Sequence, residues 1–217
     1  MKIAIDGPAG AGKSTVAKLI SEKLGINYLD TGAMYRSIAY ALINKGIDPE
    51  DADAVKNHLD EVDIEVKYIK RVQHMYLDGK DISKLIRTNE ISMGASNVSK
   101  IPEVRLKLIE MQQEIARNFD IVMDGRDICT YVLPDADHKF YITASVDERA
   151  RRRFKELPEG SNLTFEEIRE DIIKRDKNDS EREFMPLKQA EDAVLVDTTD
   201  MNIDEVIDYV LKEIGKG

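Results

Sequence analysis

The chain has 217 residues, 42% of them apolar, which fits one compact domain with insertions better than two independent domains. No apolar run approaches the length of a transmembrane helix, and the run after Lys2 is too short for a signal peptide, so we expect a cytoplasmic protein that does not bind membranes. The formal net charge of −10 opposes binding to polymeric nucleic acid. Cys129 is the one cysteine, so no intrachain disulfide can form. We expect a monomer whose partners are small molecules.

The first expected strand, residues 2–5, leads directly into a glycine-rich segment, and a helical pattern follows that ends near Leu24. The segment completes the pattern G-x-x-x-x-G-K-[ST], which is typical of a triphosphate-binding loop, although a structural turn is the alternative. Its glycines let N–H groups approach phosphate oxygens, Lys13 can reach the β- and γ-phosphates, and the Ser14 hydroxyl can bind Mg²⁺. The predicted triphosphate-binding residues are Gly7, Pro8, Ala9, Gly10, Ala11, Gly12, Lys13, Ser14 and Thr15.

Short apolar runs and helical patterns alternate along most of the remaining chain. Gly25 is a helix stop, Pro102 fits the first turn of a helix, and Asn202 is a plausible cap of the last helix. The apolar runs lie at residues 26–29, 121–123, 140–142 and 193–196. This alternation is typical of βαβ units, so we predict an α/β fold of three layers around a five-stranded parallel sheet.

Two stretches depart from this alternation. Residues 64–69 and 72–77 alternate apolar and polar side chains and precede the turn signal Asp78-Gly79, which predicts a small antiparallel β insert. Residues 149–182 are rich in charge and contain Pro158 and Gly160 between two helical patterns, as a mobile helical lid would. We therefore predict a single domain with a core of residues 1–61, 89–148 and 183–217, an insert of residues 62–88 and a lid of residues 149–182.

Polar residues follow two of the expected strands, at the sheet edge where α/β proteins bind ligands. After the second strand, the planar fork of Arg36 can hold a phosphate, with the Thr31 hydroxyl nearby. After the run 121–123, Asp124 is placed to order Mg²⁺, directly or through water. The alternatives are a helix cap with a surface arginine for the first segment, and an ion-pair turn for the second.

The expected lid carries two groups of arginines at helical spacing, Arg149 with Arg152 and Arg153, and Arg175 with Arg182 around Asp179. A solvated charged face is the alternative. Phosphoryl transfer needs positioned cations, because the migrating group spreads negative charge over its oxygens. An acceptor phosphate needs clamping and neutralisation, whereas an acceptor hydroxyl would need a general base, so the many arginines favour a phosphate acceptor.

The guanine-recognition motif Asn-Lys-x-Asp is missing, because Asp48 follows Asn44-Lys45 one position too late. A GTP-dependent switch is therefore disfavoured.

Taken together, these segments resemble the bacterial-type cytidylate (CMP) kinases, within the P-loop nucleoside monophosphate kinases, from about residue 1 to the last helix. Several separated motifs in the order of the family are more specific than the phosphate loop alone. They are IDGPAGAGKST at 5–15, LDTGAMYR at 29–36, the insert near 62–88, ASNVSKIPEVR at 95–105, DGRD at 124–127, and RDKNDSER at 175–182 followed by Pro186-Leu187.

The resemblance implies a set of contacts for the acceptor nucleotide. Arg36 and Arg126 would hold the CMP phosphate, with Thr31 nearby. The cytosine would be contacted by Ser96, Arg105 and Asp127, and the ribose by Arg175 and Asp179. Without the resemblance, Ser96 and Arg105 would be interpreted as ordinary surface residues.

The Asp127 carboxylate can accept a hydrogen bond from the cytosine amino group but would oppose the uracil carbonyl, so we expect a preference for cytosine. The resemblance also implies a lid whose arginines contact the transferring phosphoryl group. The predicted catalytic residues are Lys13, Arg126, Arg149, Arg153 and Arg182.

One residue departs from the family pattern, because Cys129 stands where the family usually has the glycine of Asp-Gly-Arg-Asp-Ile-Gly-Thr. If that position needs a positive φ, the cysteine would strain the backbone and move Asp127. An inert small side chain is the alternative to a reactive thiol.

We therefore expect an enzyme that uses ATP and Mg²⁺ to phosphorylate CMP or dCMP, giving CDP or dCDP and ADP. A kinase for another monophosphate, such as UMP or AMP, is the first alternative. A non-catalytic ATP-binding switch is less favoured, because a sensor does not require the second set of arginines. A small-molecule kinase of the shikimate type would depend on a carboxylate that activates a hydroxyl, and the sequence does not identify one.

Overall fold

The computed structural model describes residues 1–157 and 161–216. Pro158 and Gly160, which the sequence predicts within the lid, lie outside the described residues. The chain divides into a first unit of residues 1–25 and 121–217 and a second unit of residues 26–120. Among the described residues, no helix combines the length and apolar character that crossing a membrane requires.

The central sheet has five strands in the order β2-β6-β1-β7-β8. In the first unit, β1 (Lys2–Asp6) pairs in parallel with β6 (Ile121–Asp124) and β7 (His138–Thr143), and β7 pairs in parallel with β8 (Val194–Asp197). β1 and β6 are almost fully buried, as continuous apolar runs in a parallel sheet covered on both faces must be. The predicted α/β fold with a five-stranded parallel sheet is confirmed.

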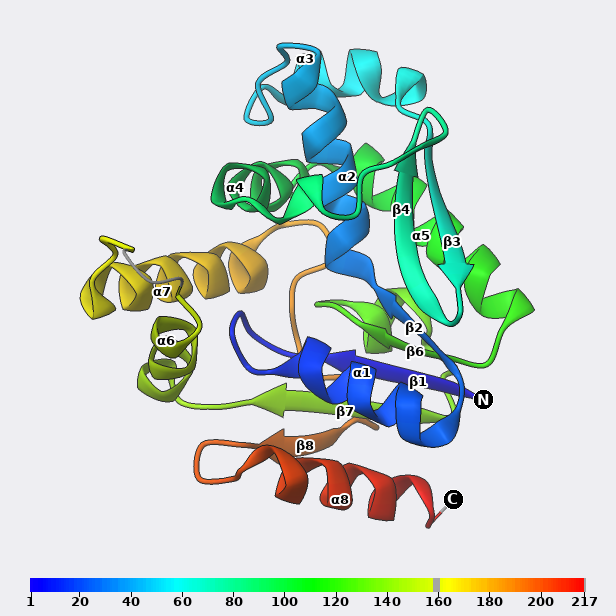
Figure 1. The fold of residues 1–217 in the computed structure, drawn as a ribbon, viewed down its shortest axis with the longest axis vertical. Helices are drawn as coiled ribbons and strands as arrows, with labels where there is room; N and C mark the ends of the chain where they lie inside the picture. The colour runs from blue at the N-terminus through cyan, green and yellow to red at the C-terminus, as the bar shows by residue number, and fades with distance from the viewer. Residues whose placement is uncertain (158–160, 217) are drawn as a thin grey trace. The chain divides into compact units, whose positions relative to one another are not determined.

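Two helices of the first unit run alongside these strands (Figure 1). α1 (Lys13–Leu24) packs against β6 and against α8 (Ile203–Ile214). Gly25 ends α1 in the left-handed conformation, with φ at 67°. Asn202 caps α8 and forms a reciprocal capping box with Glu205. Both predicted helix boundaries are therefore confirmed.

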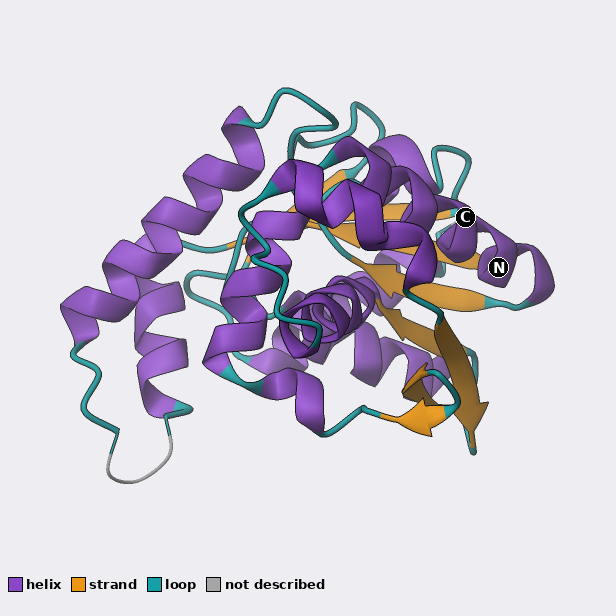
Figure 2. Cartoon of the chain, turned by 90° about the horizontal axis from the view of Figure 1, so that it is seen from above, coloured by secondary structure: helices purple, strands orange, loops and turns teal. Residues whose placement is uncertain are grey.

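The part of the predicted lid that the structure describes contains α6 (Val146–Lys155) and α7 (Phe165–Glu181). The two helices pack together through Ala150, Ile168 and Ile172 and lie side by side in Figure 2. Thr164 begins α7 with a capping box. The boundaries and motion of a lid stay predictions.

The second unit holds β2 (Asn27–Asp30) and the small antiparallel sheet, in the order β3-β4-β5. β3 (Ile64–Ile69) and β4 (Val72–Leu77) form a hairpin, and β5 (Lys80–Asp81) follows the turn at Asp78-Gly79. The predicted antiparallel insert is confirmed. The first turn, at residues 70 and 71, also has positive φ angles, but it contains neither glycine nor asparagine to signal it.

The helices of the second unit are α2 (Thr31–Asn44), α3 (Ala52–His58), α4 (Asn89–Val98) and α5 (Pro102–Asn118). Two short 3₁₀ turns lie at Leu59–Glu61 and Leu85–Arg87. α2 packs against α4. Pro102 occupies the first turn of α5, as predicted.

Gly7 provides a test of how tightly β1 and β7 constrain the segment after β1. Its φ is +147°, and an added Cβ would lie 1.9 Å from the carbonyl oxygen of Ile142. We expect Gly7→Ala to lower the free energy of unfolding by about 3 kcal/mol or more, because the backbone at Gly7 or Ile142 must move to relieve the clash. Gly46→Ala is the matched control: its φ is +75°, but its Cβ would meet open space, so we expect a cost of about 1 kcal/mol. Equal effects in urea denaturation would contradict this steric explanation.

Candidate functional site

The glycine-rich segment forms a loop between β1 and the first turn of α1. Gly7, Gly10 and Gly12 all have positive φ angles. Residues with a Cβ adopt such angles only with steric strain. Gly12 is the N-cap of α1 and offers no side chain to cap the helix. The N–H groups of the first turn and the positive end of the helix dipole therefore suit an anion.

Lys13 is buried at this loop, with 5% of its surface exposed, and its Nζ donates a 2.7 Å hydrogen bond to the Pro8 carbonyl oxygen. Burial, together with the nearby positive charge of Arg126, lowers the pKa of Lys13 to about 7. Asp124 and Asp179 oppose this shift. A phosphate bound at the loop would restore the charge of Lys13.

Ser14 and Asp124 are in direct contact. The Ser14 Oγ donates a 2.8 Å hydrogen bond to Oδ2 of Asp124, whose side chain is buried at the end of β6. The structure therefore brings together the two residues predicted to bind Mg²⁺. No group of three or more His, Cys, Asp or Glu side chains suited to a metal occurs within residues 1–157 and 161–216.

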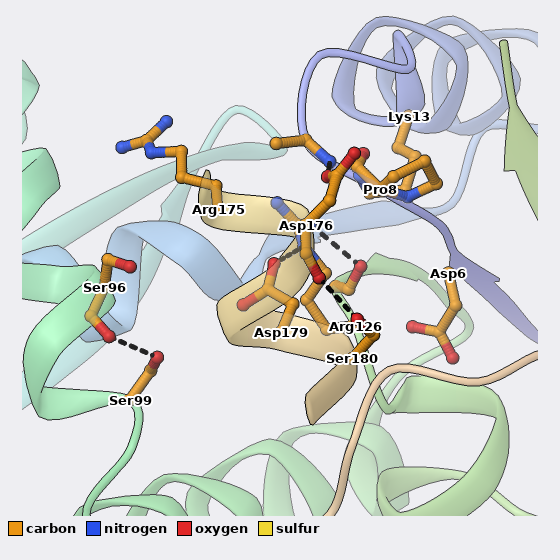
Figure 3. Close-up of polar contacts among 12 residues, drawn as sticks. Asp6, Pro8, Lys13, Ser96, Ser99, Arg126, Arg175, Asp176, Asp179 and Ser180 are labelled. Carbon is orange, nitrogen blue, oxygen red and sulfur yellow. Dashed lines mark hydrogen bonds and ion pairs between the residues drawn. The ribbon is translucent and has the colours of Figure 1, made fainter. Parts of the chain in front are cut away.

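Asp179 on α7 lies between two of the predicted phosphate-binding arginines, Arg126 and Arg182, and its position beside Arg126 can be followed in Figure 3. Its Oδ2 accepts a 2.7 Å hydrogen bond from Nε of Arg126, and its Oδ1 lies 3.9 Å from Nη1 of Arg182. Burial alone would lower the pKa of Arg126, but the carboxylates of Asp179, Asp124 and Asp176 together outweigh burial and raise that pKa. A phosphate dianion could satisfy both arginines in place of the carboxylate.

Arg175 adds to this concentration of positive charge. It is mostly buried, and burial lowers its pKa, with further contributions from the nearby guanidinium groups of Arg153 and Arg126. Its Nε lies 3.6 Å from Oδ2 of Asp171. We call Arg126, Arg153, Arg175 and Arg182 the arginine cluster. Like charges held this close in a partly buried place are typical of sites that bind a polyanion.

Arg149 has partners different from those expected. It is 4% exposed, and it donates to two backbone carbonyl oxygens, at 2.9 Å to Ala144 and at 2.8 Å to Ala9. Arg152 donates to the carbonyl oxygen and the hydroxyl of Thr198. The predicted contact of Arg149 with a transferring phosphoryl group stays a prediction.

Asp6, which sequence reasoning missed, is completely buried at the end of β1. Its carboxylate accepts hydrogen bonds from the backbone N–H groups of Ile128, at 2.9 Å, and Cys129, at 2.7 Å. Burial raises the pKa of Asp6 to about 6, and the charge of Asp127 adds to the rise. Asp6 thereby ties the start of the phosphate loop to the chain that follows the buried Asp127. A buried acidic residue just before the loop is the sequence signal that could have revealed it.

Cys129 is not strained. It is absent from the residues with positive φ, and it lies in the π-helical turn Ile128–Val132. The condition under which a cysteine would strain the backbone, a positive φ, is therefore not met at this position. Burial raises the pKa of the Cys129 thiol, which agrees with an inert side chain.

In the second unit, Asp30 organises the start of α2. Its Oδ1 accepts a 2.9 Å hydrogen bond from the Ala33 N–H, and its Oδ2 accepts a 2.7 Å bond from Nη2 of Arg36. Thr31 is buried in the first turn of the same helix. The helix cap of the alternative interpretation is present, formed by Asp30. Binding of a phosphate by Arg36 stays a prediction. Gly32 leaves room for the guanidinium group, because a Cβ would lie 3.1 Å from Nη1 of Arg36.

Ser99 links the two predicted cytosine-binding residues of the second unit. Arg105 Nη1 donates to the Ser99 carbonyl oxygen at 3.2 Å, and the Ser99 hydroxyl donates to the Ser96 carbonyl oxygen at 2.8 Å. Arg105 is 1% exposed, and its guanidinium group lies 5.8 Å from the ring centre of Tyr35. Without the family resemblance, Arg105 was interpreted as a surface residue; that interpretation is wrong, because α5 packs it inward.

The structure thus assembles two groups of predicted residues, one in each unit. The first unit holds the phosphate loop, the Ser14–Asp124 pair, Asp127 and the arginine cluster. The second unit holds Thr31 with Arg36, and Ser96 linked to Arg105. Which nucleotide group each residue contacts stays a prediction.

The sequence pattern of the family described as "Cytidylate kinase" matches residues 3–216. Curated relatives with the name cytidylate kinase come from Clostridioides difficile, 49% identical over 98% of this chain and 97% of theirs, and Bacillus subtilis, 46% identical over 99% and 96%. A solved gluconokinase from Sinorhizobium meliloti is 13% identical over 99% of this chain and 91% of its own, with a TM-score of 0.52, and it shows the fold alone.

Asp6 generates a prediction about pH and stability. Because its pKa is raised from 3.8 to about 6, the folded protein binds this proton more tightly than the unfolded chain, so the contribution of Asp6 to stability falls as the pH rises from 4 to 6. Asp6→Asn removes this titration. The quantity to measure by urea denaturation is the difference in unfolding free energy between wild type and the variant. We expect this difference, wild type minus variant, to fall by up to about 3 kcal/mol between pH 4 and pH 7. A difference that does not change with pH would contradict the shift.

Proposed function

The chain belongs to the cytidylate kinase family, and we propose that it transfers the γ-phosphoryl group of ATP to CMP or dCMP, giving CDP or dCDP and ADP. The observation that carries this proposal is the position of the arginine cluster in the same unit as the buried Lys13 of the phosphate loop. A loop of this kind alone supports binding of ATP. The arginines, which a phosphate acceptor needs, support transfer.

On the donor side, Lys13 and the loop N–H groups would hold the ATP phosphates. The Ser14 hydroxyl and the Asp124 carboxylate fit Mg²⁺, because both are oxygen donors and Mg²⁺ takes its other ligands from water and phosphate. When bound, Mg²⁺ would neutralise charge on the β- and γ-phosphates. Ser14 would bind it directly, and Asp124 directly or through water.

On the acceptor side, Arg36 and Arg126 would hold the CMP phosphate, which needs no general base. In the structure each of these arginines already pairs with a carboxylate, Asp30 or Asp179. The acceptor phosphate would replace Asp179 on Arg126, and the released carboxylate could then accept hydrogen bonds from the ribose, with Arg175 beside it. Thr31 would add its hydroxyl near the phosphate.

The base would be recognised by Ser96, Arg105 and Asp127. The Asp127 carboxylate would accept a hydrogen bond from the cytosine amino group and oppose the uracil carbonyl. Arg105 is held in place by Ser99 and by the Tyr35 ring, which supports a positioned contact rather than an exposed charge.

Closure of the lid would exclude water, which could otherwise take the γ-phosphoryl group. Arg153 and Arg182 would contact the transferring group and the donor phosphates, as would Arg149 if it exchanges its present backbone partners. We also expect a cytoplasmic monomer that binds no membrane or polymeric nucleic acid.

A kinase that prefers UMP or AMP is the first competing function, and a panel of monophosphates in a coupled ADP-release assay separates it from ours. We expect CMP and dCMP to be the best acceptors. Equal turnover of UMP and CMP would reject the specificity, and binding of ATP without transfer to any monophosphate would indicate a switch.

Two variants in the same assay test the assigned roles. Arg126→Ala should lower kcat/KM for CMP by at least about 100-fold, since a positioned cation is lost. Asp127→Asn should raise the UMP-to-CMP ratio of kcat/KM by about tenfold or more, because the amide can donate to the uracil carbonyl. Arg117→Ala removes an exposed arginine that pairs with Glu114 and should leave both quantities unchanged. If the Arg126→Ala enzyme keeps full activity, the proposed role of Arg126 in binding the acceptor phosphate is rejected.

A further inference from the structure

Both backbone polar groups of Ala9, in the middle of the phosphate loop, are bound by side chains of α6 and α7. The Ala9 N–H donates a 2.9 Å hydrogen bond to Oδ1 of Asp176. The Ala9 carbonyl oxygen accepts a 2.8 Å hydrogen bond from Nη1 of Arg149. The backbone N–H of this one loop residue is thus bound from α7, and its backbone carbonyl oxygen is bound from α6.

The two side chains that hold Ala9 also bind each other. Arg149 Nη1 lies 2.6 Å from Oδ2 of Asp176, with 5% of the Arg149 side chain and 22% of the Asp176 side chain exposed. Arg149 is fixed from a further direction by the Ala144 carbonyl oxygen, which accepts from its Nε. Asp176 reaches from α7 toward the loop beside Pro8 (Figure 3). We call Asp176, Arg149 and Ala9 the loop clamp.

A negative charge on Asp176 is unfavourable for binding at this position, because a carboxylate next to a phosphate-binding loop repels the anion that the loop would bind. Pairing with Arg149 offsets that repulsion. Asp176 also orients the backbone, because its hydrogen bond to the Ala9 N–H fixes the Pro8–Ala9 peptide in a loop whose other N–H groups must converge on phosphate oxygens. A loop ordered before the ligand arrives loses less conformational entropy on binding.

We propose that Asp176 is a positioning residue, which holds the phosphate loop through Ala9 in the shape that binds the triphosphate of the donor. The inference rests on the donor site of the proposed function. Asp176 touches neither nucleotide in this role. It acts through the loop, so its loss should weaken binding of ATP and leave binding of CMP unchanged.

The experiment measures ATP and CMP binding separately by calorimetry for wild type, Asp176→Ala and Asp176→Asn. We expect Asp176→Ala to weaken ATP binding about tenfold or more, because a charge-assisted hydrogen bond to the loop is lost. Asp176→Asn keeps one acceptor oxygen for the Ala9 N–H and should show an intermediate loss. The CMP dissociation constant should stay within about twofold, and KM for ATP should rise more than KM for CMP.

Asp147→Asn is the matched control. Asp147 on α6 forms a 2.7 Å ion pair with Arg169 on α7, so this variant removes the same charge and a contact between the same helices without touching the loop. Its ATP affinity should equal that of wild type. If Asp147→Asn weakens ATP binding as much as Asp176→Asn does, the helix pair and not the clamp is responsible, and the proposal is overturned.

A readout without any nucleotide keeps the proposal testable if Asp176→Ala does not fold. The Ala9 amide hydrogen should exchange with solvent at least about tenfold faster in Asp176→Asn than in wild type, by NMR. Unchanged ATP affinity, or equal losses for ATP and CMP together with a lower Tm, would overturn the role. Since ATP binding needs no acceptor, a wild-type protein that binds ATP but phosphorylates no monophosphate would reject the proposed function and leave this test intact.

Discussion

The burial of the Lys13 ammonium group is the constraint on which the donor side depends. Burial and the neighbouring charge of Arg126 lower its pKa, so the free protein holds an incompletely stabilised cation at the start of α1. The Pro8 carbonyl oxygen and the nearby carboxylates compensate in part. A phosphate group would compensate further, because it would bring negative charge to a place that the glycines and the helix dipole already favour.

Each of the two predicted acceptor arginines is paired with a carboxylate. Asp179 binds Arg126, and Asp30 binds Arg36. Such pairs hold long side chains in a defined position and limit the repulsion within the arginine cluster, where Arg175 lies close to two other guanidinium groups. If the acceptor phosphate binds these arginines as proposed, it competes with the two carboxylates. A carboxylate partner of this kind allows a site rich in arginine to be ordered before a ligand binds.

The phosphate loop is also held from outside at two points along its length. Asp6 binds two backbone N–H groups after Asp127, and the loop clamp holds Ala9 from α6 and α7. Glycines that permit the required φ angles also make the loop entropically costly to order. Anchors at its start and its middle reduce that cost, and they connect the loop to the segments that carry the other predicted phosphate contacts.

The sequence by itself determined what depends on local chemistry: the phosphate loop, the caps at Gly25 and Asn202, and the alternation that predicted the sheet. These signals act within a few residues. The tertiary structure alone decided the contacts of Asp6 and Asp176. The backbone partners of Asp6 lie 122 or more residues away along the chain, and the Ala9 partner of Asp176 lies 167 residues away. It also decided that Arg105 is buried and that Cys129 is unstrained. Packing sets these outcomes, and periodicity carries no information about which distant backbone group a side chain meets.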